Sequence, residues 1–149
     1  MGTKLIQLLD SAWLEWLAAR DRVPRDRVAE PGVCGHWSVK DLVGHIPLWD
    51  AEVLTDIQRW QLGLPYLTND WQQMNDDDHA AKLDRPYDLL RVEMYGAHAV
   101  TRQAISELPD DLESEDLYRV AVDTWDHYPE HTQELTSWLT SSTSKTVSD

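Results

Sequence analysis

The stretch SVKDLVGHIPLWDAEVLTDIQRW, residues 38–60, decides the fold class. Its apolar side chains recur every three or four positions, which is the spacing of one face of an α-helix. They are Leu42, Ile46, Trp49, Val53, Ile57 and Trp60. Ser38 followed by Asp41 has the pattern of a capping box, in which a hydroxyl and a carboxylate satisfy free amides at a helix start. We therefore expect a helix that begins after Ser38, ends near Gly63 and kinks at Pro47, whose ring removes one backbone donor.

Helical spacing continues on both sides of this stretch, and no alternating strand pattern competes with it. Three further helical segments are expected: residues 3–20, residues 75–108 with a break at Pro86, and residues 117–138. Asn75 is expected to cap the second of these segments. The sequence thus predicts an all-α protein, an antiparallel four-helix bundle over residues 1–140. Residues 141–149 are rich in Ser and Thr and predict a disordered polar tail.

The charge balance points to an acidic protein. Of the 149 residues, 13 are Lys or Arg and 27 are Asp or Glu, which gives a net charge of 13 − 27 = −14. Such a field repels phosphates, so nucleic acid and anionic membranes are not expected as partners. Cys34 is the single cysteine and is expected to be chemically inert. Neither a secretory signal nor a membrane span is recognisable, so we expect a cytoplasmic protein.

Two histidines suggest a metal site. His127 and His131 are four residues apart, so on a helix both imidazoles project from one face. They share the apolar stripe of the last helix, and His45 lies beside the inner stripe of residues 38–60 as a third candidate ligand. Three neutral imidazoles suit zinc, nickel or ferrous iron and leave coordination positions open. The alternative is that these are core histidines held by hydrogen bonds.

Other polar and aromatic residues are candidates for supporting roles. Asp41 and Asp123 each precede a candidate ligand by four residues and are expected to orient it, unless they serve as a helix cap and a surface charge. His36 and His79 are expected to be solvated, and His98 to be a buried hydrogen-bonding residue. Candidate pocket walls, chosen by proximity along the stripes, are Trp37, Trp49, Tyr95, Trp125 and Tyr128. No catalytic residue is identified.

Two segments resemble the DinB-like superfamily. GHWSVKDLVGH, residues 35–45, is similar to the entry of the second helix in that family, and DHYPEH, residues 126–131, to the histidine pair of its last helix. The resemblance spans about residues 3–140. It implies a four-helix bundle with a metal held by His45, His127 and His131. Pro129, between two of these ligands, departs from the family pattern and is tolerable if the helix begins near it.

The resemblance also implies a function. The superfamily contains thiol-dependent S-transferases, a maleylpyruvate isomerase and detoxifying hydrolases. We expect a metal-dependent enzyme that activates a low-molecular-weight thiol or water for attack on an electrophilic small molecule, with the thiol as co-substrate. The alternative is a non-catalytic protein that binds or sequesters a small molecule and whose metal is absent or structural. A homodimer is expected from the family and from apolar residues in the connections.

Overall fold

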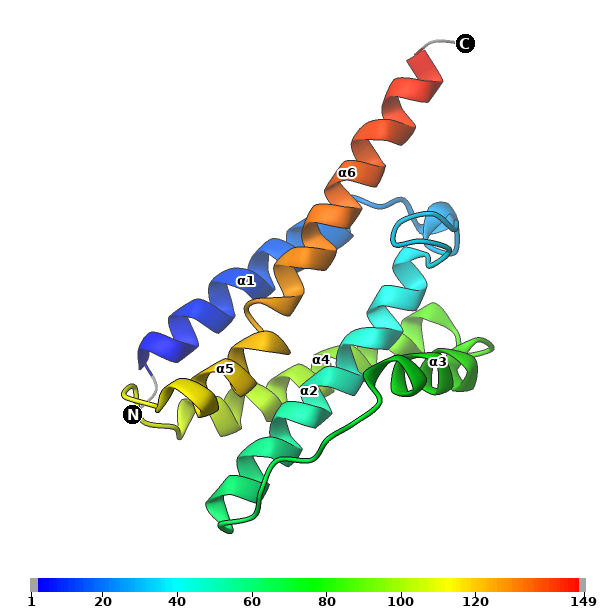
Figure 1. Cartoon of the computed structure of the whole chain (residues 1–149). Coiled ribbons are helices and arrows are strands. Elements are labelled where there is room, and N and C mark those ends of the chain that lie inside the picture. The colour runs from blue at the N-terminus through cyan, green and yellow to red at the C-terminus, as the bar shows by residue number, and fades with distance from the viewer. Residues whose placement is uncertain (1–2, 148–149) are drawn as a thin grey trace.

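The computed structural model describes residues 3–147, with side chains through Ser142. Within this range the chain forms an all-helical bundle without a β-strand, apart from one isolated bridge between Cys34 and Trp37. The elements, in chain order, are α1 (Thr3–Asp21), a short 3-10 helix η1 (Arg25–Arg27), α2 (Val39–Gln61), α3 (Trp71–Lys82), α4 (Tyr87–Ser106), α5 (Ser114–Val122) and α6 (His127–Val147) (Figure 1).

The start of α2 confirms the prediction from its cap. The Ser38 hydroxyl accepts a hydrogen bond from the Asp41 amide at 3.2 Å, and the Asp41 carboxylate accepts from the Ser38 amide at 2.8 Å. The helix continues through Pro47 and ends at Gln61, followed by Gly63 with φ +70°. α2 packs mainly against α4, and its buried side chains form the centre of the bundle.

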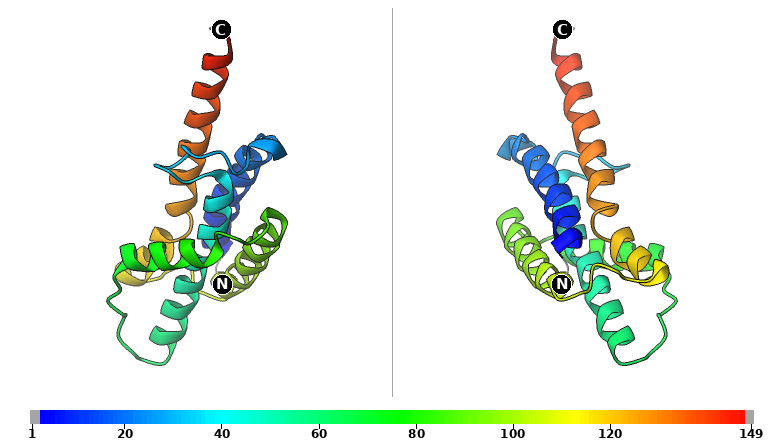
Figure 2. Two further views of the ribbon diagram at one scale, coloured as in Figure 1. Left: turned by 90° about the vertical axis from the view of Figure 1, so that its right-hand side faces the viewer. Right: turned by 90° about the vertical axis from the view of Figure 1, so that its left-hand side faces the viewer.

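The core lies where α1, α2, α4 and α6 meet. Its largest fully buried side chains include Trp16, Tyr128, Leu9, Leu42 and Met94. The indole of Trp16 donates to the Met94 Sδ at 3.4 Å, which satisfies its buried N–H. α1 packs along α6, whose C-terminal part projects beyond the other helices (Figure 2).

Three predicted segments differ from the structure. α3 begins at Trp71, not Asn75, because Asp70 caps it by accepting from the Gln73 amide at 3.1 Å. Asn75 lies within α3. The predicted last helix is divided into α5 and α6, and the helix continues to Val147 through most of the predicted tail. Residues 148–149 lie outside the described range.

The break between α5 and α6 has a local cause. The Thr124 carbonyl accepts from the amides of both His127 and Tyr128 at 2.9 Å, so α6 starts afresh at this point. Pro129 therefore falls in the first turn of α6, where its missing amide costs no helical hydrogen bond. A continuous apolar stripe does not reveal such a break, because the stripe resumes on the same side of the bundle.

None of the helices in the described part of the chain is both long and apolar enough to cross a membrane.

Candidate metal centre

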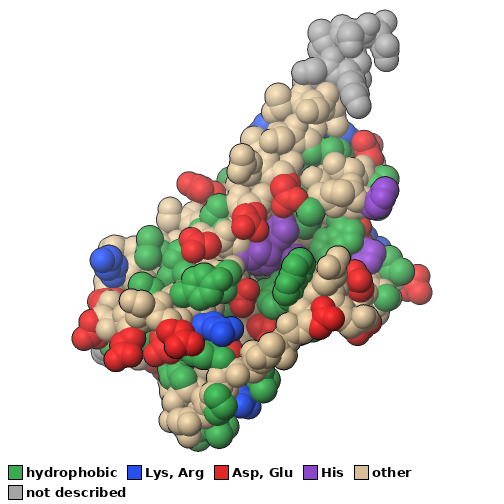
Figure 3. Space-filling model, in the orientation of Figure 1, with side chains coloured by type: hydrophobic (Ala, Val, Ile, Leu, Met, Phe, Trp, Pro, Cys, Tyr) green, Lys and Arg blue, Asp and Glu red, His purple; other side chains and the backbone are tan. Residues whose placement is uncertain are grey.

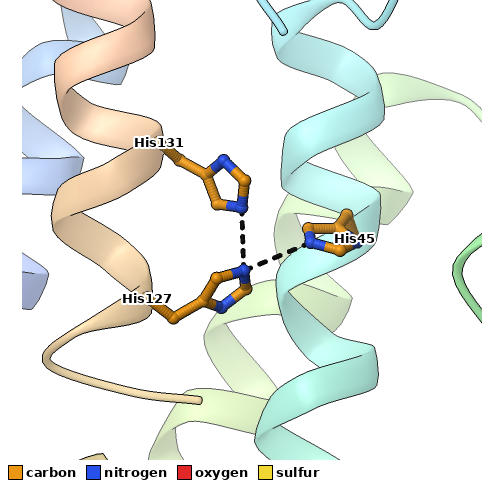
Figure 4. Close-up of side chains that lie close together, drawn as sticks. All are labelled: His45, His127 and His131. Atoms are coloured by element: carbon orange, nitrogen blue, oxygen red, sulfur yellow. Dashed lines mark hydrogen bonds between the residues drawn. The ribbon is translucent and has the colours of Figure 1, made fainter. Parts of the chain in front are cut away.

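The three predicted ligands come together. His45 on α2 and the pair on α6 direct their Nε2 atoms to one point (Figure 4). The Nε2 of His127 lies 3.2 Å from that of His45 and 2.8 Å from that of His131. Two imidazoles on one zinc ion, with Zn–N bonds of about 2.0–2.1 Å, have nitrogens about 2.9–3.4 Å apart, depending on the coordination angle. The observed spacing is close to what one divalent ion requires.

The protonation of the cluster also suits a metal. The Nδ1 of His131 lies 2.8 Å from a carboxylate oxygen of Glu134, which fixes the proton on Nδ1 and leaves the Nε2 lone pair facing the other histidines. Burial, reinforced by the charges of the neighbouring histidines, lowers the pKa of His45 to about 2. Burial and the charge of His131 lower the pKa of His127 to about 3. Neutral imidazole is the form that binds a metal.

Hydrogen bonds among the three histidines cannot satisfy all of their Nε2 atoms. A single nitrogen carries one proton or one lone pair, so the His127 Nε2 cannot form two good hydrogen bonds to two other ring nitrogens at once. A cation at the centre accepts all three inward lone pairs together. The residues present therefore fit a divalent metal.

The residues that surround the ligands are partly those expected. Glu134, which sequence reasoning missed, orients His131; its position three residues later on the same helix is a pattern that the sequence contains. Asp41 bonds to Ser38 and, at 3.1 Å, to His79, and so serves as the helix cap. His79 is accordingly half-buried and stacked on Trp37, not solvated.

The thiol of Cys34 lies beside the centre. Ligand atoms of Cys34, His131 and Glu134 fall within 4.8 Å of one another. Burial, followed by the nearby Glu134 carboxylate, raises the pKa of the thiol to about 12, so it stays protonated at neutral pH. This agrees with the inert cysteine expected from the sequence.

A cleft of about 750 Å³ opens over the histidines. Trp37 and Trp49 line it as predicted, and Trp71, which is 62% exposed, stands at its edge. In Figure 3 the histidine surface lies in a hollow between apolar side chains and acidic groups. The cleft is of the size that holds a small organic molecule.

Three predicted wall residues are elsewhere. The Tyr95 hydroxyl accepts a hydrogen bond from the Arg20 Nη2 at 2.7 Å, and Trp125 packs against the core. Tyr128 is fully buried, and its hydroxyl donates to the Asp50 carboxylate at 2.6 Å and lies 3.3 Å from the buried Nδ1 of His98. Being close to a ligand in sequence does not place a side chain on the ligand's face, since neighbours on a helix point about 100° apart.

The cleft contains an acidic region that sequence reasoning also missed. Glu52 and Asp56 follow His45 on the same face of α2, and Asp123 lies across from them at the end of α5. Burial, then repulsion by Asp56 and Glu52, raises the pKa of Asp123 to about 7. Asp123 was expected to orient the His127 imidazole. Its side chain is directed to the acidic region of the cleft and not to that ring.

No family model matches the sequence, and no match is found among curated proteins. Two solved structures share the fold. A crystal structure of an uncharacterised protein from Escherichia coli UTI89 superposes with a TM-score of 0.80 at 18% identity and covers 96% of this chain and 95% of that chain. The colibactin self-resistance protein ClbS, crystallised in complex with a dsDNA, gives a TM-score of 0.76 at 15% identity and covers 89% of this chain and 91% of that chain.

These comparisons correct two expectations. The predicted function, a metal-dependent enzyme that activates a thiol or water, is overturned, because the similar structure with a stated role is a self-resistance protein bound to dsDNA. The exclusion of nucleic acid is also wrong, since a protein of this fold is crystallised with dsDNA. The net charge alone could not exclude nucleic acid, because it is a sum over the whole surface and does not describe any one region of it. The homodimer and the cytoplasmic location remain predictions.

Proposed function

We propose that this protein is a resistance protein that binds a toxic small molecule in the cleft over its histidine centre and acts in contact with duplex DNA. The observation that carries the proposal is the convergence of three histidines at the floor of a 750 Å³ cleft. The shared fold of a colibactin self-resistance protein supports the same role.

The proposal includes one divalent metal, zinc, nickel or ferrous iron, held by His45, His127 and His131. When bound, the ion supplies a Lewis acid that holds and polarises an electron-rich group of the cleft's occupant. Glu134 keeps His131 in the ligating tautomer, and burial keeps His45 neutral. The proposed bundle consists of four antiparallel helices, α1, α2, α4 and α6, in the DinB-like arrangement, with α3 and α5 as additions that wall the cleft.

The charge distribution indicates which part of the surface repels the phosphates of DNA least. Residues 20–41 and 78–93 contain eight Lys or Arg and eight Asp or Glu, so these two segments are neutral. They adjoin at one end of the bundle, where the Lys40 Nζ donates to the Leu83 carbonyl at 3.3 Å and Arg25 pairs with Asp88. The rest of the chain holds the other 5 cations and 19 acids, 5 − 19 = −14. Phosphates meet the least repulsion at this neutral end.

A resistance assay tests the proposed function. The chain is expressed in a colibactin-producing bacterium that lacks its own self-resistance protein, and survival is counted. We expect the wild-type chain to restore survival and His131→Ala to fail, while Glu15→Gln, an exposed change on α1, behaves as wild type. Equal survival with the empty vector and the wild-type chain would refute the proposal.

A binding assay tests the contact with DNA. A labelled duplex of about 20 base pairs is titrated with protein, and its fluorescence anisotropy is followed at several salt concentrations. We expect binding at low salt that weakens as salt rises, and further weakening when Lys40 and Arg22 at the neutral end are changed to Ala. Anisotropy that never changes at low salt would remove DNA from the proposal.

A further inference from the structure

One face of α2 runs along the floor of the cleft. His45, Trp49, Glu52 and Asp56 follow one another at helical spacing, and all four line the cleft. With a rise of 1.5 Å per residue, Glu52 lies about 10 Å and Asp56 about 16 Å from His45 along the helix axis. The cleft therefore has two chemically different ends, a histidine end and an acidic end formed by Glu52, Asp56 and Asp123.

The protein's own cations compensate the acidic end only in part: burial raises the pKa of Asp56 and outweighs the charges of Arg119 and Arg59, which lower it. Asp56 is only 9% exposed, yet no hydrogen bond or ion pair to its carboxylate occurs within the described residues. Glu52 accepts one bond, from the Asn69 side chain at 3.0 Å. Arg119 is the one cation among the cleft-lining residues that the structure describes, and its guanidinium is stacked over Tyr66 at 4.5 Å. Five carboxyl groups line the whole cleft, three of them at the acidic end, so the formal charge of the lining is 1 − 5 = −4 when all are ionised.

The spacing of these carboxylates argues against a second metal ion. Among the described residues, their oxygens do not form a group within 4.8 Å of one another, as the three histidines do. Oxygen ligands of a single divalent ion lie about 3–4 Å apart. Carboxylates that repel one another but do not come together as three ligands of one ion suit a larger cation with several N–H donors.

Aromatic side chains stand between the two ends. The Trp49 indole is held by a 2.8 Å bond from Nε1 to the Asn75 Oδ1, so its orientation is fixed. Trp71 and Tyr118 are exposed at the opening of the cleft. Aromatic faces bind apolar groups and attract organic cations.

We propose that the cleft selects an elongated organic cation, with an ammonium or guanidinium group at the acidic end, an apolar middle against the tryptophans and an electron-rich group at the histidine end. This rests on the proposed function and names its substrate class. The desolvated carboxylates provide charge complementarity for the cation, and their distance from His45 sets a length of about 10–16 Å between its two ends.

A pair of fluorescent probes tests the selection. Dansylcadaverine carries an aromatic group and a primary amine at opposite ends, and its N-acetyl derivative differs only in lacking the charge. Binding is followed by dansyl fluorescence at neutral pH. We expect the amine to bind at least tenfold more tightly than the acetylated probe, because the latter leaves the carboxylates unpaired. Equal affinities, or no binding of the amine at millimolar concentration, would overturn the inference.

Variants show whether the preference arises at the acidic end. Asp56→Asn keeps the shape and removes the charge, and should lower amine affinity five- to tenfold with no effect on the acetylated probe. Glu15→Gln is the matched control. An Asp56→Asn variant that binds the amine like wild type would refute the cation site, even if the resistance assay succeeds. Selective amine binding without any resistance would refute the proposed function and retain the cation site.

Discussion

The buried carboxylate of Asp50 makes a quantitative prediction about stability. Asp50 is fully buried on α2, behind the histidine face, and its Oδ1 accepts from the Tyr128 hydroxyl at 2.6 Å. Its Oδ2 is buried without a hydrogen-bond partner among the described residues. Burial raises the pKa of Asp50 to about 7, although the bond from Tyr128 works in the opposite direction. In the unfolded chain the pKa is that of an ordinary aspartate, 3.8.

The sign of the effect follows from these two values. Between about pH 4 and pH 7 the folded protein binds more protons at Asp50 than the unfolded chain does, so its stability falls as pH rises through this window. A difference of about 3 pKa units corresponds to about 4 kcal/mol. Asp50→Asn preserves the acceptor for Tyr128 and cannot ionise, so it removes this dependence. The free energy of unfolding of the variant minus that of wild type should rise by about 4 kcal/mol from pH 4 to pH 8.

Urea unfolding monitored by tryptophan fluorescence measures this difference, since Trp13 and Trp16 are buried in the core. Asp111→Asn, at an exposed position between α4 and α5, is the matched control. A stability difference for Asp50→Asn that stays constant from pH 4 to pH 8 would show that Asp50 is ionised in the folded protein throughout, and the argument from burial would fail.

Three further predictions concern the metal centre and the helix cap. Elemental analysis of untagged protein should show metal in wild type and in His36→Ala, and a sharp loss in His131→Ala; equal contents in all three would exclude the site. Glu134→Gln should weaken metal binding about 10- to 100-fold in a competition titration with a chelator, because the carboxylate no longer holds the His131 proton on Nδ1. Unchanged metal affinity would show that Glu134 does not have this role. Ser38→Ala should lower the free energy of unfolding by about 1 kcal/mol in urea titrations at unaltered metal affinity, whereas no loss would contradict the cap.

The parts of the fold that the sequence predicted correctly depend on local interactions. Ser38 and Asp41 satisfy amides within one turn of helix, so their pattern is readable without knowing the rest of the structure. The proximity of His45 to the histidines of α6 could be predicted because the apolar stripes of both helices must face a common core. The break after Val122 was missed because a hydrogen bond to the Thr124 carbonyl, not a change in hydrophobic pattern, starts α6.

The convergence of the three histidines could be predicted from the sequence, whereas the surroundings of the candidate site could be predicted only in part. Glu134, three residues after His131, and the series from His45 to Asp56 are helical spacings that the sequence contains. The position of Asp123 opposite Asp56 depends on how α5 packs on α2, which no local pattern specifies. The nucleic-acid prediction used only the net charge of −14, and the folded structure is needed to show that the neutral segments 20–41 and 78–93 adjoin at one end.

The two proposed partners are compatible because the neutral end and the acidic cleft are separate places on the molecule. A small organic cation is attracted to the phosphates of DNA by the same Coulomb forces that draw it to Glu52, Asp56 and Asp123. In the cleft these forces act on partly desolvated carboxylates beside aromatic faces, where they are screened less than in the ion atmosphere of a duplex. A protein that meets DNA through its neutral end thus presents a competing acidic site to any cation released there. Added duplex DNA should therefore reduce dansylcadaverine binding much less than the loss of Asp56 does.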